Sequence, residues 1–291
     1  MVSGKTLRKQ LRTAGFYALV IAVMLPTVFV FYWMITLSLK PQVEAAGYPP
    51  SFFRFSVTFK GYQEVFAKHP FLLYTWNSLV VAVGCTVLGL AVGLPAAYSI
   101  AHWRQRGLAL TMLVARIIPG ISYLIPWYIL FRNLRMVDTY QALILTHLVV
   151  GLPIIIWVMI GFFEDIPPEL KDAALIDGCS HYGAFWRVAV PLVKPGIVAT
   201  SILSFIFSWN NFLFSVILAG RNTRTLPIAV FNMIGYEEIN WGPLANMIGY
   251  EEINWGPLAA AATMITLPVI ILTLIVQRHI VTGLTFGAVK G

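Results

Sequence analysis

The chain has 291 residues, of which 58% are hydrophobic and 11% are charged, and its formal net charge is +8. Soluble domains carry about 25% charged residues, so this composition excludes an ordinary soluble domain and indicates a membrane protein. The positive charges lie in short segments between apolar runs rather than in one basic stripe, which excludes nucleic acid as the expected partner and favours a role in membrane topology.

The first 14 residues form a basic segment. They include Lys5, Arg8, Lys9 and Arg12 and no acidic residue. The apolar run that follows is too long for the core of a cleavable signal peptide and has no A-x-A site, so we expect a retained first span. Because Lys and Arg in short flanking segments stay on the cytosolic side of a membrane, we predict that segment 1–14 is cytosolic.

Six apolar runs reach the length of about 20 residues that a helix needs to cross a bilayer. They cover residues 15–39, 76–100, 108–131, 142–163, 196–218 and 258–281. Backbone groups inside a membrane must be bonded within the span, and continuous runs differ from the short alternating segments of a barrel. We therefore predict an all-α integral membrane fold with six transmembrane helices over 15–281 and a cytosolic tail at 282–291.

This topology decides which loops face which side of the membrane. Residues 101–107 and 164–195 are expected in the cytosol, and residues 40–70, 132–141 and 219–257 outside. The first outer loop includes Lys40, Arg54, Lys60 and Lys68. Under the same charge rule, those four basic residues favour the opposite orientation, with this loop in the cytosol. We follow the N-terminal segment, because it has basic residues and no acidic one.

The third run contains a charged residue, Arg116, followed by Pro119 and Gly120. Proline and glycine together predict a kink in the helix. A charge inside a membrane is costly and tends to face a polar path, so Arg116 is a candidate for contact with a transported solute. The alternative is that its long side chain reaches back to the membrane surface. In the fourth run, we expect His147 to be packed or hydrogen-bonded rather than to relay protons.

Residues 164–195 are unusually polar for this chain. Pro167 and Pro168 are typical of a helix start and Gly178 of a helix end, so a short helix is predicted over 168–177. A second helix is predicted over 181–190, ending before Pro191.

The first of these two helices carries groups that suit a partner protein. Ala173 and Ala174 permit another backbone to approach closely, and carboxylates are available to accept hydrogen bonds. The carboxylates are those of Asp172 and Asp177. The alternative is an ordinary solvated amphipathic loop.

The fifth run contains a cluster of polar and aromatic residues: Ser208, Trp209, Asn210 and Asn211. A sugar is recognised by hydrogen-bonding groups together with a flat aromatic face, so these residues are candidates for a substrate path. The alternative is that Ser and Asn bond neighbouring helices to one another.

The segment NMIGYEEINWGPLA occurs at 232–245 and again, letter for letter, at 246–259. Two copies do not make a solenoid, which needs several units. Only the second copy leads directly into the last apolar run, and the first becomes extra loop, which loops tolerate well. We predict that the duplication is dispensable, the alternative being that the extra copy adds a function. Tyr236, Glu237 and Trp241 in this loop are expected to face an external partner or to lie at the membrane surface.

The sequence DAALIDG, followed by VAVP, resembles the EAA loop of binding-protein-dependent ABC importer permeases. That pattern has Glu-Ala-Ala, three residues, Gly, nine residues and Ile-x-Leu-Pro. The matching positions here are Asp172, Ala173, Ala174, Gly178, Val188, Val190 and Pro191. Further similarity lies in WNSLVVAV (76–83), AAYSIA (96–101), SWNNFL (208–213) and GLTFGAVKG (283–291). Together these resemble the second permease subunit of the carbohydrate-uptake subgroup, similar to maltose-type importers.

This resemblance implies a type I ABC importer permease in the bacterial inner membrane. It also implies that residues 168–177 are a coupling helix seated in a cleft on a cytosolic ATPase. The ATPase-coupling residues are then Glu169, Asp172, Ala173, Ala174, Asp177 and Gly178. The implied partners are one second permease subunit, two ATPase subunits that bind ATP and Mg, an external substrate-binding protein and membrane lipid. The tail from 284 is implied to reach the ATPase, the alternative being a disordered terminus.

The chain itself lacks the motifs of an energy source or an enzyme. It has no G-x-x-x-x-G-K-[ST] phosphate loop, no H-E-x-x-H metal pair and no G-x-S-x-G nucleophile motif, and its two cysteines have no metal-binding spacing. We therefore expect no catalytic residue, metal or cofactor in this chain. An ion-driven carrier would need acidic residues in its spans, and none falls in the six runs. Disaccharides, monosaccharides and polyols all remain open as substrates.

Overall fold

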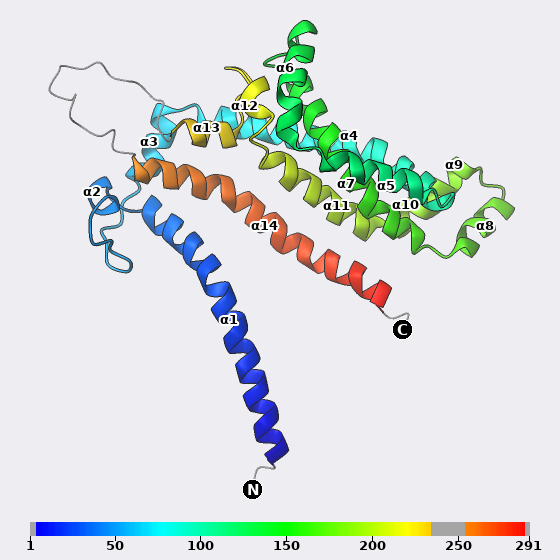
Figure 1. The fold of residues 1–291 in the computed structure, drawn as a ribbon, viewed down its shortest axis with the longest axis horizontal. Helices are drawn as coiled ribbons and strands as arrows, with labels where there is room; N and C mark the ends of the chain where they lie inside the picture. The colour runs from blue at the N-terminus through cyan, green and yellow to red at the C-terminus, as the bar shows by residue number, and fades with distance from the viewer. Residues whose placement is uncertain (1–3, 234–253, 289–291) are drawn as a thin grey trace. The chain divides into compact units, whose positions relative to one another are not determined.

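The structure is a computed structural model that describes residues 4–233 and 254–288, and all regular elements in those residues are helices (Figure 1). The long ones are α1 (Gly4–Ser38), α4 (Phe71–His102), α7 (Tyr140–Glu164), α11 (Lys194–Trp209) and α14 (Trp255–Ala288). The short ones are α2 (Gln42–Ala45), α3 (Lys60–Lys68), α5 (Arg106–Val114), η1 (Ala115–Ile117), η2 (Gly120–Tyr123), α6 (Leu124–Asn133), α8 (Pro168–Ile176), α9 (His181–Ala184), η3 (Phe185–Ala189), α10 (Val190–Leu192), α12 (Ser215–Leu218) and α13 (Leu226–Asn232).

The chain divides into two compact units. Unit 1 contains residues 1–69 and 233–264, and unit 2 contains residues 70–232 and 265–291. Four of the described helices are long and apolar enough to cross a membrane, namely Arg8–Ser38, Phe71–His102, Tyr140–Glu164 and Trp255–Gln277. A fifth span results if His181–Leu192 and Lys194–Trp209, which meet at 78°, are counted together. The chain is therefore a multi-pass membrane protein.

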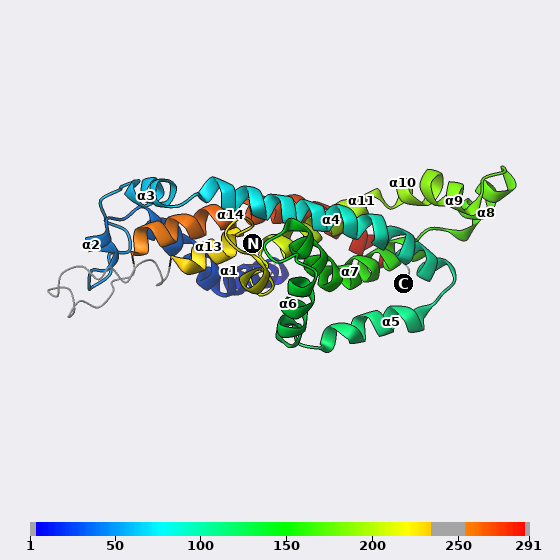
Figure 2. The same cartoon turned by 90° about the horizontal axis from the view of Figure 1, so that it is seen from above.

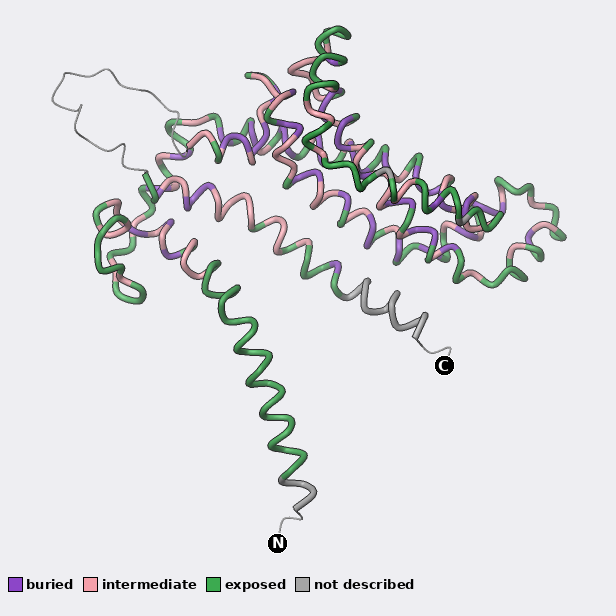
Figure 3. The backbone as a smooth tube through the Cα atoms, viewed as in Figure 1, coloured by how far each residue is buried: buried purple, intermediate pink, exposed green. Residues whose placement is uncertain are grey.

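In unit 1, α1 is exposed along most of its length (Figure 3). Residues 8–31 are all exposed, although the helix is almost entirely apolar beyond Arg12. A soluble helix hides its apolar face, whereas a span presents apolar side chains to lipid on every side. This exposure fits the predicted first span.

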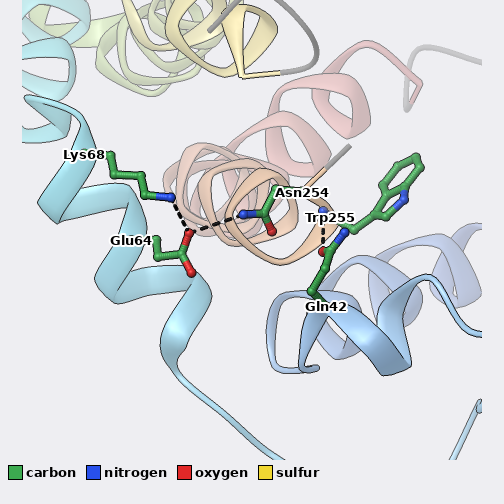
Figure 4. Close-up of polar contacts among 5 residues, drawn as sticks. All are labelled: Gln42, Glu64, Lys68, Asn254 and Trp255. Atoms are coloured by element: carbon green, nitrogen blue, oxygen red, sulfur yellow. Dashed lines mark hydrogen bonds and ion pairs between the residues drawn. The ribbon is translucent and has the colours of Figure 1, made fainter. Parts of the chain in front are cut away.

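The start of α14 is held to the helices that follow α1 (Figure 4). The backbone N–H of Trp255 donates to Gln42 Oε1 at 3.0 Å, and Asn254 Nδ2 donates to Glu64 Oε2 at 3.3 Å. Lys68 Nζ forms an ion pair with the same Glu64 oxygen at 2.9 Å. Trp255 belongs to the second copy of the repeat, so this copy does lead directly into the last helix, as predicted, and the helix starts three residues before the expected position. Residues 234–253, with most of the repeat and Tyr236, Glu237 and Trp241, lie outside the described residues.

Unit 2 is built on α4, α7 and α11, which pack on one another. Glycines on α4 bring the first two helices close together. A β-carbon at Gly84 would lie 2.7 Å from the Ile144 side chain, and one at Gly89 or Gly93 would lie 2.5 or 2.8 Å from Ile155. Small residues at a helix interface permit this close packing in membranes, where water supplies no driving force between the helices.

The third apolar run differs from its prediction. Instead of one span over 108–131, the chain forms α5, two 3-10 turns and α6, with extended backbone at Ile118 and Pro119. The predicted kink at Pro119 and Gly120 is confirmed, but it is a full break. An α5 of nine residues is roughly 14 Å long, about half the hydrocarbon thickness of a bilayer, so neither α5 nor α6 spans one alone.

The fifth run is also interrupted. Helix α11 ends at Trp209, residues 210–214 are not helical, and α12 completes the run. At the other end of α11, the helical segment that precedes it runs through Pro191 to Leu192 rather than ending before the proline. The prolyl ring is accommodated because a π-helical turn, η3, widens the backbone just before it.

The carboxylate of Asp138 holds the loop between α12 and α13 in place through hydrogen bonds. Asp138 accepts hydrogen bonds from the N–H of Gly220 at 3.0 Å, the N–H of Thr223 at 2.9 Å, the Thr223 hydroxyl at 2.8 Å and Asn222 Nδ2 at 2.8 Å. Burial opposes ionisation, but the bonds from Thr223, Asn222 and Gly220 outweigh it and hold the pKa of Asp138 below its usual value. Asn77 adds donors to the carbonyls of Asn222 and Arg224.

Candidate functional site

The predicted short helix is present as α8, which ends within one residue of the expected position. Pro168 is its first residue and Glu169 places a negative charge in its first turn, both favourable at a helix N-terminus. At the other end, Gly178 adopts φ +84°. The Gly178 N–H donates to the carbonyl of Leu175 at 3.1 Å and the Cys179 N–H to that of Ala174 at 3.0 Å. These two bonds form a Schellman cap, which stops the helix firmly.

Helix α8 has an inner and an outer face. Ala174 is buried, Lys171 and Leu175 are half-buried, and α8 packs on α9 and η3. Figures 1 and 2 place α8 and α9 at the end of unit 2 far from α13. Five of the six predicted coupling residues are exposed: Glu169, Asp172, Ala173, Asp177 and Gly178. The sixth, Ala174, permits close approach by this chain's own α9 and η3 rather than by a partner.

The outer face combines apolar and acidic groups. Leu170 is 45% exposed and Ile176 is 86% exposed, a high value for an aliphatic side chain. In the described part of the chain, no ion pair is formed by Glu169 and Asp172 on α8 or by Asp177 directly after it.

A cavity of about 630 Å³ lies behind α8. Its walls come from the ends of α4 and α7, from α8, and from α9 and η3. The polar side chains that line it are Tyr98, His102, Arg104, Glu164, Asp165 and Lys171. Lys171 Nζ lies 2.7 Å from His102 Nδ1 and 2.8 Å from His102 Nε2. Sequence reasoning missed this contact because the two residues are 69 positions apart.

The candidate path residue Arg116 lies on η1, at the break in the third run, and its side chain is exposed. It makes no hydrogen bond to residues 208–211 in the described structure. Nearby, a β-carbon on Gly120 would lie 3.1 Å from Leu213, and Trp127 stacks on Phe214 at 5.4 Å. The break in the third run therefore packs against the break in the fifth.

The four candidates at the end of α11 have different surroundings. Ser208 is buried and its hydroxyl lies 2.8 Å from Nδ1 of His147, which is also buried. The expectation that His147 is packed and hydrogen-bonded is confirmed. Trp209 is buried, and its indole N–H donates to the carbonyl of Ile265 at 3.1 Å.

The two asparagines are more accessible. Asn211 is half-buried and its Oδ1 accepts from the N–H of Phe214 at 3.3 Å, whereas Asn210 is exposed. Ser208 and Trp209 thus bond helices together in this structure, and Asn210 is the exposed member of the group.

Helix α14 continues to Ala288. The expected tail at 282–291 is therefore helical as far as residue 288. Residues 289–291 lie outside the described residues.

Comparisons with known proteins show the family to which the chain belongs. The model of the family described as binding-protein-dependent transport system inner membrane component matches residues 89–285. The probable ABC transporter permease protein y4oR of Sinorhizobium fredii is 38% identical over 290 residues, which cover 99% of this chain and 98% of that protein. The trehalose transport system permease protein SugB of Mycobacterium tuberculosis is 37% identical over 265 residues, 89% of this chain and 91% of that one.

A solved structure shares the fold. The crystal structure of a bacterial ABC transporter involved in the import of the acidic polysaccharide alginate matches with a TM-score of 0.74 and 18% identity, over 96% of this chain and 98% of the chain compared. The resemblance seen in the sequence, to permeases of carbohydrate-uptake ABC importers, is confirmed by these relatives. The chain belongs to the family of binding-protein-dependent transport system inner membrane components.

Proposed function

We propose that this chain is a permease subunit of an ABC importer that carries a sugar or sugar alcohol across the bacterial inner membrane. The observation that carries the proposal is α8, a short helix with a Schellman cap whose outer face exposes Leu170, Ile176 and three unpaired carboxylates. A capped helix transmits a push or a pull better than a flexible loop. The family to which the chain belongs consists of transport-system components, and in such a system the partner of α8 would be the ATPase.

In this proposal the chain does no chemistry of its own. ATP and Mg bind to two separate ATPase subunits, which grip the outer face of α8. A second permease subunit completes the path, and an external binding protein delivers the solute. Closure of the ATPases moves α8, and the spans switch between inward-open and outward-open forms.

Six crossings with both termini in the cytosol remain the proposed topology. The third crossing would be formed by α5, η1, η2 and α6 together, and the fifth by α11 with α12. Broken spans are found at midplane binding sites of transporters, where freed backbone groups and polar side chains meet the solute. The two breaks pack together here, which supports a solute path near Arg116 and Asn210.

Carbohydrate as the substrate class is supported by named relatives, among them the trehalose permease SugB and the sulfoquinovosyl glycerol permease SmoH of Agrobacterium fabrum, which is 32% identical over 263 residues. Ligand screening of the cognate binding protein would identify the sugar.

The coupling role is tested by crosslinking from Ala173, which is exposed, rather than from Ala174, which is buried. Ala173→Cys carrying a photoreactive maleimide, in a Cys179→Ser background, should capture in native vesicles a subunit that contains a G-x-x-x-x-G-K-[ST] motif. Ala174→Cys is the matched control and should label and capture poorly. A labelled, membrane-inserted Ala173→Cys chain that captures no such subunit would refute the proposal.

A further inference from the structure

In unit 1, the segment between α2 and α3 folds back beside α1 (Figure 1). The ring of Phe52 packs on that of Trp33, with 5.2 Å between ring centroids, and on that of Phe29 at 6.0 Å. The ring of Phe53 packs on that of Tyr32 at 6.0 Å, and the Tyr32 hydroxyl donates to the carbonyl of Phe52 at 2.7 Å. The two phenylalanines, called the Phe52–Phe53 tip below, therefore lie beside the body of α1 rather than beyond its end.

Two contacts hold the folded segment at the end of α1. Lys40 is buried, its ammonium donates to the carbonyl of Ser51, and it lies 4.3 Å from the ring centroid of Trp33. A cation over an aromatic face is attracted to the ring. Further along, the N–H of Thr58 donates to the carbonyl of Leu39 at 2.8 Å. The segment is thus fastened on both sides of its tip, and the tip has a defined place along α1.

That place is at the edge of the hydrocarbon layer. Arg12 is the last charged residue before the apolar part of α1, and a helix crosses the hydrocarbon in about 20 residues, so α1 leaves it near Tyr32. Tyrosine and tryptophan are enriched at this boundary, which suits Tyr32 and Trp33. Phe29 lies deeper, about 13 Å from the end of α1 at 1.5 Å per residue. Because the tip packs on these three rings, it lies at the same depth.

The side chains of the tip suit lipid as a partner. Phe53 is 82% exposed and Phe52 is 40% exposed, so both present apolar surface that no other part of unit 1 covers. Arg54 follows directly and is exposed, and its long side chain can keep its charge among lipid headgroups while its stem lies on apolar surface. Aromatic rings next to such a cation are what a membrane boundary favours.

We propose that the Phe52–Phe53 tip inserts into the leaflet opposite the N-terminus and anchors this loop to phospholipid. The loop is then fixed to the bilayer by its own aromatic residues in addition to the spans on either side of it. The anchor requires that α1 crosses the membrane, and it is independent of the coupling role of α8.

Spin labels on the full chain test the insertion in vesicles of phosphatidylethanolamine and phosphatidylglycerol. Oxygen concentrates in hydrocarbon, whereas a water-soluble nickel chelate stays outside, so the ratio of oxygen access to nickel access reports depth. Each label is attached to one introduced cysteine in a Cys179→Ser background, in which the remaining Cys85 is buried. The background chain without an introduced cysteine should take up no label.

Helix α1 provides its own depth scale. Val28→Cys and Ile35→Cys are both at exposed positions of this helix, and Lys60→Cys, at an exposed charged position that starts α3, reports water. The ratio at Phe53→Cys should lie between those at Val28→Cys and Ile35→Cys, and several-fold above that at Lys60→Cys. A ratio nearer to that at Lys60→Cys than to that at Ile35→Cys would overturn the anchor and leave the tip to a protein partner.

A second variant tests whether packing on α1 holds the tip at this depth. Phe52→Ser, added to Phe53→Cys, removes the rings' contact with Phe29 and Trp33, so the ratio should fall toward the value in water. Val57→Ser is the matched control, because Val57 is exposed and lies outside the tip, and it should leave the ratio unchanged. Equal ratios with and without Phe52→Ser would contradict docking of the tip on α1.

Discussion

The backbones of Gly61 on α3 and Gly256 in the first turn of α14 touch. A β-carbon on Gly61 would lie 2.8 Å from both the carbonyl carbon and the carbonyl oxygen of Gly256. Backbone atoms cannot rotate out of the way as a flexible side chain does, so the contact is available only to glycine at position 61.

Gly61→Ala should therefore lower the stability of unit 1. Relief of the clash requires α3 or α14 to shift, which costs about 1–3 kcal/mol in overpacked sites. Thermal unfolding in detergent, followed by size-exclusion chromatography, would measure the loss. Gly15→Ala is the matched control, because an added β-carbon there meets nothing within 4 Å; equal unfolding temperatures for the two variants would contradict the prediction.

The two copies of the repeat allow a deletion that tests whether the duplication is dispensable. Removing 232–245 or removing 246–259 yields the same chain, since the copies are identical and adjacent. The shortened chain keeps the residues that dock on Gln42 and Glu64, so insertion, unfolding temperature and uptake should be unchanged. A marked fall in expression or uptake would show that the extra copy has a role.

Substituting the equivalent glycine in each copy tests which copy occupies the docking position beside Gly61. Gly256 is buried beside Gly61, so Gly256→Leu should destabilise the chain by overfilling that contact. Gly242→Leu makes the same change in the first copy, outside the described residues, and should have little effect on the unfolding temperature. The reverse order would mean that the first copy, not the second, occupies the docking position.

Gly178 caps α8 in the left-handed region, with no atom within 4 Å of an added β-carbon. The cost of a side chain there is conformational, about 1–2 kcal/mol, and Asn tolerates this region better than a β-branched residue. ATP-driven uptake should fall in the order wild type, Gly178→Asn, Gly178→Val, with membrane insertion intact. Gly161→Ala, which meets nothing within 4 Å, should keep uptake; normal uptake in Gly178→Val would count against coupling through α8.

Asp138 should make the chain sensitive to acid. Because its pKa is lower in the folded protein than in the unfolded chain, the stability it contributes is present above about pH 4 and is lost as pH falls through the folded-state pKa. In Asp138→Asn, the side-chain NH2 group faces N–H donors where a carboxylate oxygen accepted from them. The free energy of unfolding should therefore fall by about 2 kcal/mol at pH 7. The variant should also show a flatter dependence of unfolding temperature on pH between 3 and 6, whereas the exposed control Asp165→Asn should resemble the wild type. Parallel pH curves for wild type and Asp138→Asn would argue against the carboxylate.

Arg116→Ala should change the apparent affinity or selectivity of uptake while the ATPase still co-purifies. The reason is that an exposed guanidinium at the break in the third run can donate to hydroxyl oxygens of a solute. Arg132→Ala on α6, also exposed, is the control. Unchanged uptake kinetics for every sugar tested would remove Arg116 from the path.

The sequence alone determined the features that depend on neighbouring residues. The long apolar runs predicted α1, α4, α7 and α14, because a helix that crosses lipid needs only length and apolar character. Pro168 and Gly178 predicted the limits of α8, because the residues within a few positions of a helix end determine where the helix starts and stops. The pattern around Asp172 and Gly178 also led to the family.

Only the tertiary structure decided which way side chains point. A span that is apolar on every side has no periodicity to reveal its packing face, so the burial of Ser208 and Trp209 and the exposure of Asn210 were not predictable. Pro119 and Gly120 predicted the kink in the third run, but the break in the fifth run and the packing of the two breaks where Gly120 meets Leu213 came only from the tertiary structure. The bond of Asp138 to Thr223 and the contact of Lys171 with His102 join residues 85 and 69 positions apart, and such pairs are set by how the helices pack, not by any local signal.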